Sequence, residues 1–183
     1  MTNDEQLMLA FQAGSQEAFT ELFERYRQPI FGFFRRRLDD PARAEDLAQE
    51  TFVAVLRAAA RYEPRALFRT YLYAIASRLL AVERRKSTAR PGENGDGSEV
   101  TAPGGSEASL FLRRAVEQLE PDFREVLMLR EYEELSYEEI SQLLRVPVNT
   151  VRSRLFRARM ALKQLLAPIS KVLRTEKDLR HQS

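Results

Sequence analysis

The sequence predicts an all-α protein in which two small helical domains are joined by a flexible linker. Apolar residues recur at three- and four-residue spacing over most of the 183 residues, and strand-like alternation is absent. Residues 87–106 interrupt this pattern and hold five of the seven glycines, a composition typical of a flexible tether. We therefore expect domains over residues 1–86 and 108–167, a linker over residues 87–107 and a C-terminal tail over residues 168–183.

The first domain should begin with two helices. Leu7 lies at the start of a short helix that should stop near Gly14, and Ser15 can cap the next helix. This second helix carries apolar residues on one face, namely Phe19, Leu22, Phe23, Tyr26, Ile30 and Phe33. Pro29 lies within the pattern, and we expect it to interrupt and kink the helix.

A third helix should begin at Asp40 and Pro41, because aspartate is a favourable N-cap and proline fits the first helical position. A loop is expected over residues 61–67, followed by a long helix from Phe68 to about residue 86. Phe68 and Leu72 should lie in the core. The face of the third helix that should be buried consists of Ala44, Leu47, Ala48, Thr51, Phe52, Val55 and Ala59.

After the linker, helices are predicted over residues 110–119 and 121–132, followed by a helix-turn-helix over residues 136–166. Ser136 and Glu139 form the capping-box pattern that begins its first helix. The residues of this helix that should face the core are Ile140, Leu143 and Leu144.

The turn of this motif should lie at Val146 and Pro147, because a proline disfavours helix at the preceding residue. Asn149 or Thr150 can then cap the second helix. Its apolar stripe consists of Val151, Leu155, Ala158, Leu162 and Leu165. The residues that should point away from the stripe are Asn149, Arg152, Ser153, Phe156, Arg157 and Met160.

The face that points away from the stripe has the chemistry of a DNA-reading helix. Arginine can pair bidentately with guanine, and an apolar side chain such as Phe156 can contact a thymine methyl group in the major groove. Arg154, Arg159 and Lys163 flank the stripe and suit phosphates. An ordinary helical hairpin with a solvated basic face is the alternative.

Charge distribution supports an anionic partner for the C-terminal part, although the net charge is only +2. Eight basic residues and no acidic residue lie between Ile140 and Thr175. An acidic patch precedes them and consists of Glu131, Glu133, Glu134, Glu138 and Glu139.

Composition excludes several classes of chemistry. The sequence has no cysteine and one histidine, His181, which argues against disulfides, thiolate metal sites and thiol redox chemistry. No arrangement of residues suggests a catalytic centre, so we expect no enzymatic activity, no metal and no cofactor. An acidic N-terminus and the absence of an apolar run of about 18 residues predict a cytoplasmic protein without membrane insertion.

Three segments resemble the sigma factors of bacterial RNA polymerase, specifically the extracytoplasmic-function (ECF) group, which has only regions 2 and 4. Residues 135–140 and 146–159 resemble region 4.2, residues 44–52 resemble region 2.2, and residues 68–76 resemble region 2.3. The resemblance implies a region 2 helical bundle, a region 4 helix-turn-helix and a factor that directs transcription initiation.

The resemblance also implies a role for three sets of residues. Region 2 would dock on core polymerase through Asp46, Gln49 and Glu50. The loop and helix that follow would capture the melted −10 strand through Tyr62, Arg65, Arg69, Tyr71 and Arg78, with Arg61, Phe68 and Tyr73 supplying further charge and aromatic surface. The alternative for these rings is a place in the core, which is more common for aromatic residues at helical spacing and which we expect for Phe68. The −35 duplex would be read by Arg152, Ser153, Phe156 and Arg157, with Asn149, Arg154, Arg159 and Lys163 beside them.

Some positions depart from the family pattern. Tyr71 stands where tryptophan is usual, Arg78 where asparagine helps to line the base pocket, and Val82 where aspartate is common. In the turn of region 4, Arg145 and Asn149 replace frequent glycines; Arg145 could contact a phosphate and Asn149 could cap the helix.

Partners follow from the same resemblance: core RNA polymerase, promoter DNA and an anti-sigma factor. A linker of about 20 residues has a root-mean-square span of roughly 25 Å, which suits a tether between two promoter contacts. The sequence leaves three alternative functions open: a free-standing helix-turn-helix transcription regulator, an adaptor that has lost promoter recognition, and a nucleic-acid hydrolase.

Overall fold

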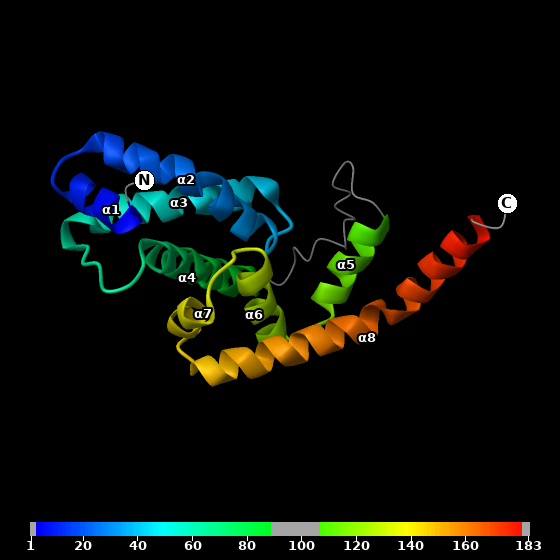
Figure 1. The fold of residues 1–183 in the computed structure, drawn as a ribbon. Helices are drawn as coiled ribbons and strands as arrows, with labels where there is room; N and C mark the ends of the chain where they lie inside the picture. Colours follow the sequence, from blue (N-terminus) through cyan, green and yellow to red (C-terminus); the bar gives the residue numbers. More distant parts are fainter. Residues whose placement is uncertain (1–2, 89–106, 181–183) are drawn as a thin grey trace. The chain divides into compact units, whose positions relative to one another are not determined.

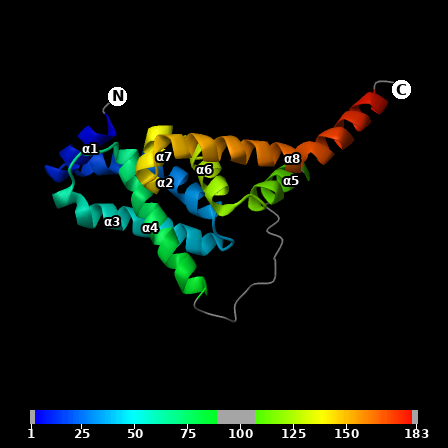
Figure 2. The same cartoon turned by 90° about the horizontal axis from the view of Figure 1, so that it is seen from below.

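The structure, a computed structural model, describes residues 3–88 and 107–180, and these ranges contain helices and no strand (Figures 1 and 2). Two compact units divide between Glu99 and Val100. The predicted all-α class is therefore confirmed. Most of the predicted linker lies outside the described residues, although the helices on either side extend into its ends. None of the helices in the described ranges is long and apolar enough to cross a membrane.

The first unit is built around α2, which packs against α1, α3 and α4. α1 also packs against a short 3-10 helix, η1, and against α4. Large side chains that are fully buried in this unit include Met8, Leu22, Phe33, Phe34 and Phe68. The elements are α1 (Asp4–Gln12), α2 (Gln16–Arg35), α3 (Pro41–Ala58), η1 (Ala59–Arg61) and α4 (Phe68–Thr88).

Local sequence signals account for the helix boundaries in this unit. Ser15 and Asp40 are the N-caps of α2 and α3, as predicted, and their side chains accept hydrogen bonds from backbone N–H groups of the first turn. Gly14 has a φ of +108° between α1 and α2, a conformation that side chains other than glycine rarely adopt. All seven residues of the predicted apolar face of α3 are buried.

The interruption expected at Pro29 does not occur, because α2 continues through this residue to Arg35. A proline inside a helix removes one backbone hydrogen bond at a cost of about 3 kcal/mol. Ile30, Phe33 and Phe34 follow it and are fully buried, and burying three such side chains offsets that cost. Packing therefore overrides the local preference.

The second unit is built around α8, which packs against α5, α6 and α7. Leu129, Leu135, Ile140, Val151 and Leu155 form its buried core. The last helix continues beyond the predicted end at residue 166, so that the predicted tail is helical as far as Arg180. The elements are α5 (Glu107–Glu117), α6 (Pro121–Glu131), α7 (Tyr137–Leu144) and α8 (Val148–Arg180).

Candidate nucleic-acid interface

The second unit contains the predicted helix-turn-helix, in which a short turn joins α7 to α8 (Figure 1). The Ser136 side chain accepts a hydrogen bond from the Glu139 N–H at 3.2 Å, and the Glu139 carboxylate accepts one from the Ser136 N–H at 2.8 Å. These two bonds form the predicted capping box. They fix the start of α7, against which α8 packs.

The turn itself differs in one detail from the prediction. Because α8 begins at Val148, Asn149 and Thr150 lie inside its first turn, and the prediction that one of them caps the helix is wrong. Arg145 ends α7 in the left-handed conformation, with φ of 56° and ψ of 44°. The Ser141 hydroxyl donates a hydrogen bond to the Val146 carbonyl at 2.6 Å and closes the turn.

The faces of α8 are separated as predicted as far as Met160, whereas Leu162 and Leu165, the last two residues of the predicted apolar stripe, are half-buried. Val151, Leu155 and Ala158 are buried against the other helices of the unit. Phe156 is 66% exposed, although an aromatic ring of this size normally lies in a core. The other residues predicted to point outward are also exposed: Asn149, Arg152, Ser153, Arg157 and Met160. This half of α8 therefore presents arginines around one apolar ring.

The basic residues at the flank of this face are partly engaged within the protein. Arg159 binds Glu131 of α6 at 2.6 Å, and this hydrogen bond raises the pKa of the Arg159 guanidinium. Arg154 forms an ion pair with Asp122, also of α6. Lys163 is exposed. Two of the three predicted phosphate partners are thus held by carboxylates of the neighbouring helix.

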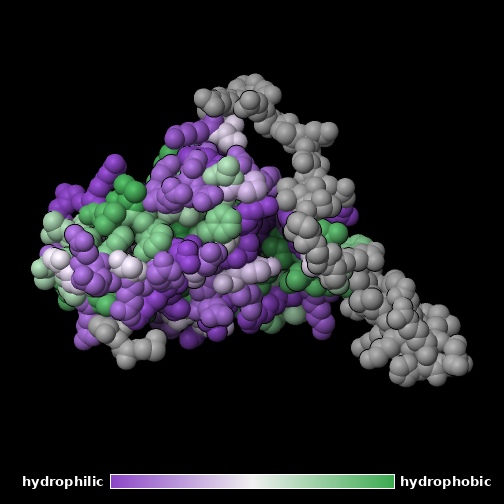
Figure 3. Space-filling view, turned by 90° about the horizontal axis from the view of Figure 1, so that it is seen from above, coloured by the Kyte–Doolittle hydropathy of each residue, from purple (hydrophilic) through white to green (hydrophobic). Residues whose placement is uncertain are grey.

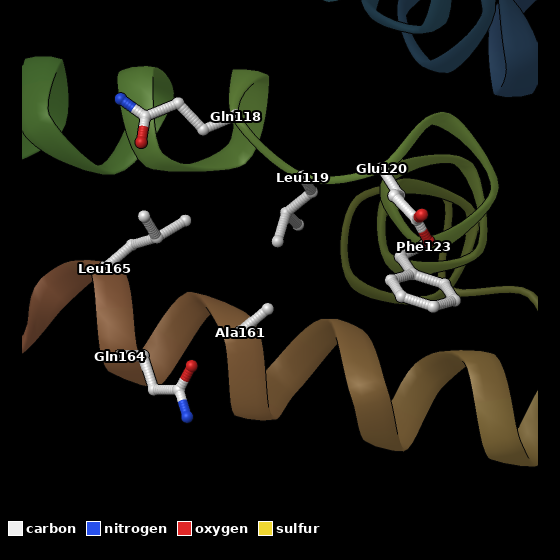
Figure 4. Close-up of a pocket in the computed structure, with 7 residues that line it drawn as sticks. All are labelled: Gln118, Leu119, Glu120, Phe123, Ala161, Gln164 and Leu165. Carbon is white, nitrogen blue, oxygen red and sulfur yellow. The ribbon is translucent and has the colours of Figure 1, made fainter.

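An open groove lies within the second unit, between α8 and the connection from α5 to α6 (Figure 4). Leu119 and Phe123 point toward the part of α8 that carries Ala161. Glu120 is the one ionisable residue of this lining, so the groove lacks the paired groups that acid–base chemistry needs. The lining residues are Gln118, Leu119, Glu120, Phe123, Ala161, Gln164 and Leu165.

In the first unit, the predicted aromatic residues around the loop that precedes α4 are less available than expected. Tyr62 and Tyr73 are 5% and 2% exposed, and Phe68 and Leu72 belong to the core as predicted. The Tyr62 ring packs against the half-buried Tyr71 ring, with centroids 5.3 Å apart. Burial raises the pKa of Tyr62 to about 12. Of the tyrosines predicted to face DNA, Tyr71 is therefore the one with a partly exposed ring.

Basic residues surround this loop and the beginning of α4. Arg61, Arg65 and Arg78 are exposed, and Arg69 is half-buried. The Arg65 side chain, 84% exposed, pairs with Glu63 at 2.6 Å. Tyr71 and Arg78 are seven residues apart on α4 and hence lie on one side of this helix. The loop and the start of α4 thus combine positive charge with one aromatic surface.

The predicted polymerase-binding residues lie on the outer surface of α3. The side chains of Asp46 and Glu50 are 63% and 48% exposed, and Gln49 is exposed. Arg43 binds Glu50 at 3.1 Å and Glu83 of α4 at 2.7 Å, and the hydrogen bond with Glu83 raises the pKa of Arg43. This arginine fixes one edge of the acidic surface.

Apolar side chains of α3 are exposed as well. Val53 and Leu56 are 40% and 44% exposed. Figure 3 shows that hydrophobic and hydrophilic residues are mixed on the face of the molecule that it draws. A surface of mixed polarity with exposed aliphatic residues is suited to a protein partner.

Several residues that support these surfaces were not predicted from the sequence. Arg43 and Glu83 join α3 to α4, and Asp122 holds Arg154. Glu5 and Gln12 of α1 bond to the backbone on either side of the loop before α4. Each of these contacts joins residues that lie far apart in the sequence, so no local pattern could have indicated them.

Known families account for both units. The model of sigma-70 region 2 matches residues 22–90, and the model of sigma-70 region 4 matches residues 112–162. Two solved structures share the fold at 24% identity: CnrH in complex with the cytosolic domain of CnrY (TM-score 0.69, 90% of this chain and 97% of that chain) and RpoE in complex with the anti-sigma factor NepR from Bartonella quintana (TM-score 0.66, 81% and 96%).

Curated relatives match over almost the whole chain. The RNA polymerase sigma-H factor of Pseudomonas aeruginosa is 36% identical and the ECF RNA polymerase sigma-E factor of Escherichia coli is 34% identical, each over 91% of this chain and 95% of the relative. Sigma factor CarQ of Myxococcus xanthus is 35% identical over 88% of this chain and 97% of its own length. The chain therefore belongs to the ECF group of the sigma-70 family and is a non-enzymatic factor that directs promoter-specific transcription initiation.

Proposed function

We propose that this sigma factor holds a promoter at two points while it is bound to core RNA polymerase. Region 4 reads the −35 element as duplex, and region 2 captures the −10 strand once it has melted. The observation that carries this proposal is the outer face of α8, where Phe156 is 66% exposed among arginines while Val151, Leu155 and Ala158 on the opposite side are buried. That arrangement leaves the base-reading residues accessible in the first turns of a helix that can enter a major groove.

The −35 contacts divide into two kinds. Arg152, Ser153, Phe156 and Arg157 read base edges, with Asn149 beside them at the start of the helix. Lys163 binds phosphate, as do Arg154 and Arg159 once DNA competes with the carboxylates that hold them. The linker between the two units spans the distance between the promoter elements.

In region 2, the −10 strand binds along the loop before α4 and the start of that helix. Arg65, Arg69 and Arg78 contact phosphates or bases, and Tyr71 offers the stacking surface. The buried ring of Tyr62 packs against Tyr71 and supports it. Asp46, Gln49 and Glu50 on α3 dock on core polymerase.

An anti-sigma factor controls the protein in this proposal, and the site of action is the cytoplasm, where polymerase and DNA lie. Support comes from the two structural relatives, which were solved with the cytosolic domain of CnrY and with the anti-sigma factor NepR.

One experiment tests the proposed function as a whole. Purified protein is added to sigma-free core polymerase, and run-off transcription is measured on genomic promoter fragments. Association with core and specific initiation are expected. Failure to associate with core would contradict the proposal, and association without initiation would indicate that promoter recognition has been lost.

A pair of substitutions tests the division of the −35 contacts. Arg152→Ala should cost about 1–3 kcal/mol at the matched promoter and relax one base position, whereas Lys163→Ala should weaken binding to all sequences alike. Binding of holoenzyme to a set of single-base promoter variants measures both effects. Equal losses on every sequence for Arg152→Ala would refute its role in base reading.

A further inference from the structure

Helix α1 holds both ends of the loop that leads from η1 into α4. Glu5 lies in its first turn and Gln12 is its last residue. These residues are seven positions apart and thus lie on one side of the helix. Met8, between them, is fully buried. One side of α1 therefore combines an apolar anchor with a polar group at each end.

Gln12 binds the beginning of the loop. Its side-chain amide donates to the carbonyl oxygens of Ala59 and Ala60 at 3.0 and 3.1 Å, with a third contact to that of Tyr62 at 3.3 Å. The Ala59 carbonyl also accepts from the Tyr62 N–H within the 3-10 turn, whereas carbonyl groups at the end of a helical segment commonly lack partners within the helix. Gln12 supplies donors to them and fixes the path of the backbone into the loop.

Glu5 binds the end of the loop. Its carboxylate accepts a hydrogen bond from the backbone N–H of Phe68 at 2.6 Å. Phe68 is the first residue of α4, where N–H groups lack helical partners and a negative charge is favourable. The neighbouring Asp4 binds Arg25 of α2 at 2.6 Å and also accepts from Tyr26. α1 is thus itself fastened to the core of the unit.

Between these two attachments the loop is exposed. Glu63, Pro64 and Arg65 are exposed, and Leu67 is 52% exposed. The ends of the loop are therefore fixed by α1, while the residues between them remain accessible to a ligand.

We propose that Glu5 and Gln12 are positioning residues for the capture of single-stranded promoter DNA. By fixing both ends of the loop, they hold Arg65 and the start of α4 in the arrangement that receives the strand, and so reduce the ordering cost of binding. This inference rests on the proposed role of the loop in −10 recognition and extends it to α1, a helix outside the set of residues proposed to bind DNA.

Gln12→Glu is the main test. A carboxylate cannot donate a hydrogen bond and would place a negative charge against three carbonyl oxygens. The probe is a fluorescent single strand that carries the −10 segment of a promoter mapped by run-off transcription. Holoenzyme with the Gln12→Glu variant should bind this strand about threefold to tenfold more weakly than wild-type holoenzyme does. Binding of the −35 duplex should stay unchanged.

Matched variants separate positioning from charge and from folding. Gln16→Glu makes the same charge change on the exposed start of α2 and should leave the affinity for the −10 strand unchanged. Glu5→Gln retains an oxygen that can accept from Phe68 and should keep most of this affinity, whereas Glu5→Met should lose it. If Gln12→Glu does not fold, Gln12→Met removes the same hydrogen bonds without adding charge.

Arg65→Ala distinguishes failure of this inference from failure of the proposed function. If Arg65→Ala weakens −10 binding and the variants of Gln12 and Glu5 do not, the positioning role is overturned and the loop remains the binding site. If all of them bind the −10 strand normally, both proposals are wrong. Equal losses at the −10 strand and the −35 duplex would also overturn the positioning role, because they would indicate a general loss of structure.

Discussion

Two arginines of α8 are already engaged with carboxylates of α6. Arg159 and Arg154 lie beside the face of α8 that we propose reads bases, and each is paired with a carboxylate of α6. Exposed ion pairs of this kind contribute at most about 1 kcal/mol to stability. Their larger consequence is expected in DNA binding, because a phosphate must compete with the carboxylate for the same guanidinium group.

Glu131→Gln should therefore strengthen binding of region 4 to promoter DNA. Loss of the negative charge weakens the hold of residue 131 on Arg159, so a phosphate competes better; the affinity should rise and the dependence of log Kd on log salt should steepen by up to about one unit. Titration of −35 duplex at several salt concentrations measures both. Glu134→Gln removes the same charge from an exposed position and serves as the control; an equal effect there would show that the Arg159 pair is irrelevant.

The hydroxyl group of Tyr62 affects the stability of the first unit. This hydroxyl is buried and has no hydrogen-bond partner among the described residues, a situation that costs free energy of folding. Tyr62→Phe should leave the free energy of unfolding unchanged or raise it by about 1 kcal/mol, as measured by urea denaturation at neutral pH. A clear loss of stability would show that the hydroxyl is satisfied.

The same substitution should change the response to alkaline pH. Because burial raises the folded-state pKa of Tyr62 to about 12 from an ordinary value of 10, the folded state disfavours the ionised phenol; this costs no stability below pH 10, and stability falls as pH rises from 10 toward 12. Wild-type protein should therefore lose more stability than Tyr62→Phe between pH 10 and 12.

At the scale of elements, the turn between α7 and α8 places Arg145 in a conformation that favours glycine. Arg145 adopts a left-handed conformation with φ of 56°, which is unfavourable for residues with a side chain and easy for glycine. The turn is nevertheless formed, because α7 and α8 pack together on either side of it. Arginine at this position carries a conformational cost.

Arg145→Gly should accordingly stabilise region 4. We expect the free energy of unfolding to rise by up to about 1 kcal/mol, because relief of the left-handed strain exceeds the entropy that glycine adds to the unfolded chain. Denaturation followed by circular dichroism measures the change. Gln142→Gly, inside α7, should instead destabilise by about 1 kcal/mol; stabilisation by both variants would contradict the explanation.

Helix boundaries were predictable where a side chain marks them and unpredictable where packing decides. Ser15, Asp40 and Ser136 cap their helices as expected, because an N-cap is a contact over two or three residues. The predicted interruption at Pro29 and the predicted N-cap at Asn149 were both wrong. α2 remains helical through Pro29 because the aromatic residues that follow it are buried. α8 begins at Val148, one residue before Asn149, so Asn149 cannot be its N-cap.

For the whole molecule, the division into two units makes a prediction about folding. Each unit has its own buried core, and the boundary lies between Glu99 and Val100. Residues 1–99 and 100–183 produced as separate chains should each unfold cooperatively, and their summed circular dichroism should match that of the full chain.

Both fragments should be helical, yet a mixture of them should support little run-off transcription, because the covalent tether raises the effective concentration of the second contact. Full activity of the mixture would show that the linker is dispensable.

The sequence by itself determined the helices, the faces of α3 and α8, the two-domain organisation and the family. These features depend on periodicity and on capping over three or four residues, which helix geometry fixes locally. Only the tertiary structure decided that Tyr62 and Tyr73 are buried, that Glu131 holds Arg159, and that Glu5 and Gln12 fasten the loop before α4. These contacts join residues between 28 and 63 positions apart, or depend on how helices pack, and no local spacing specifies them.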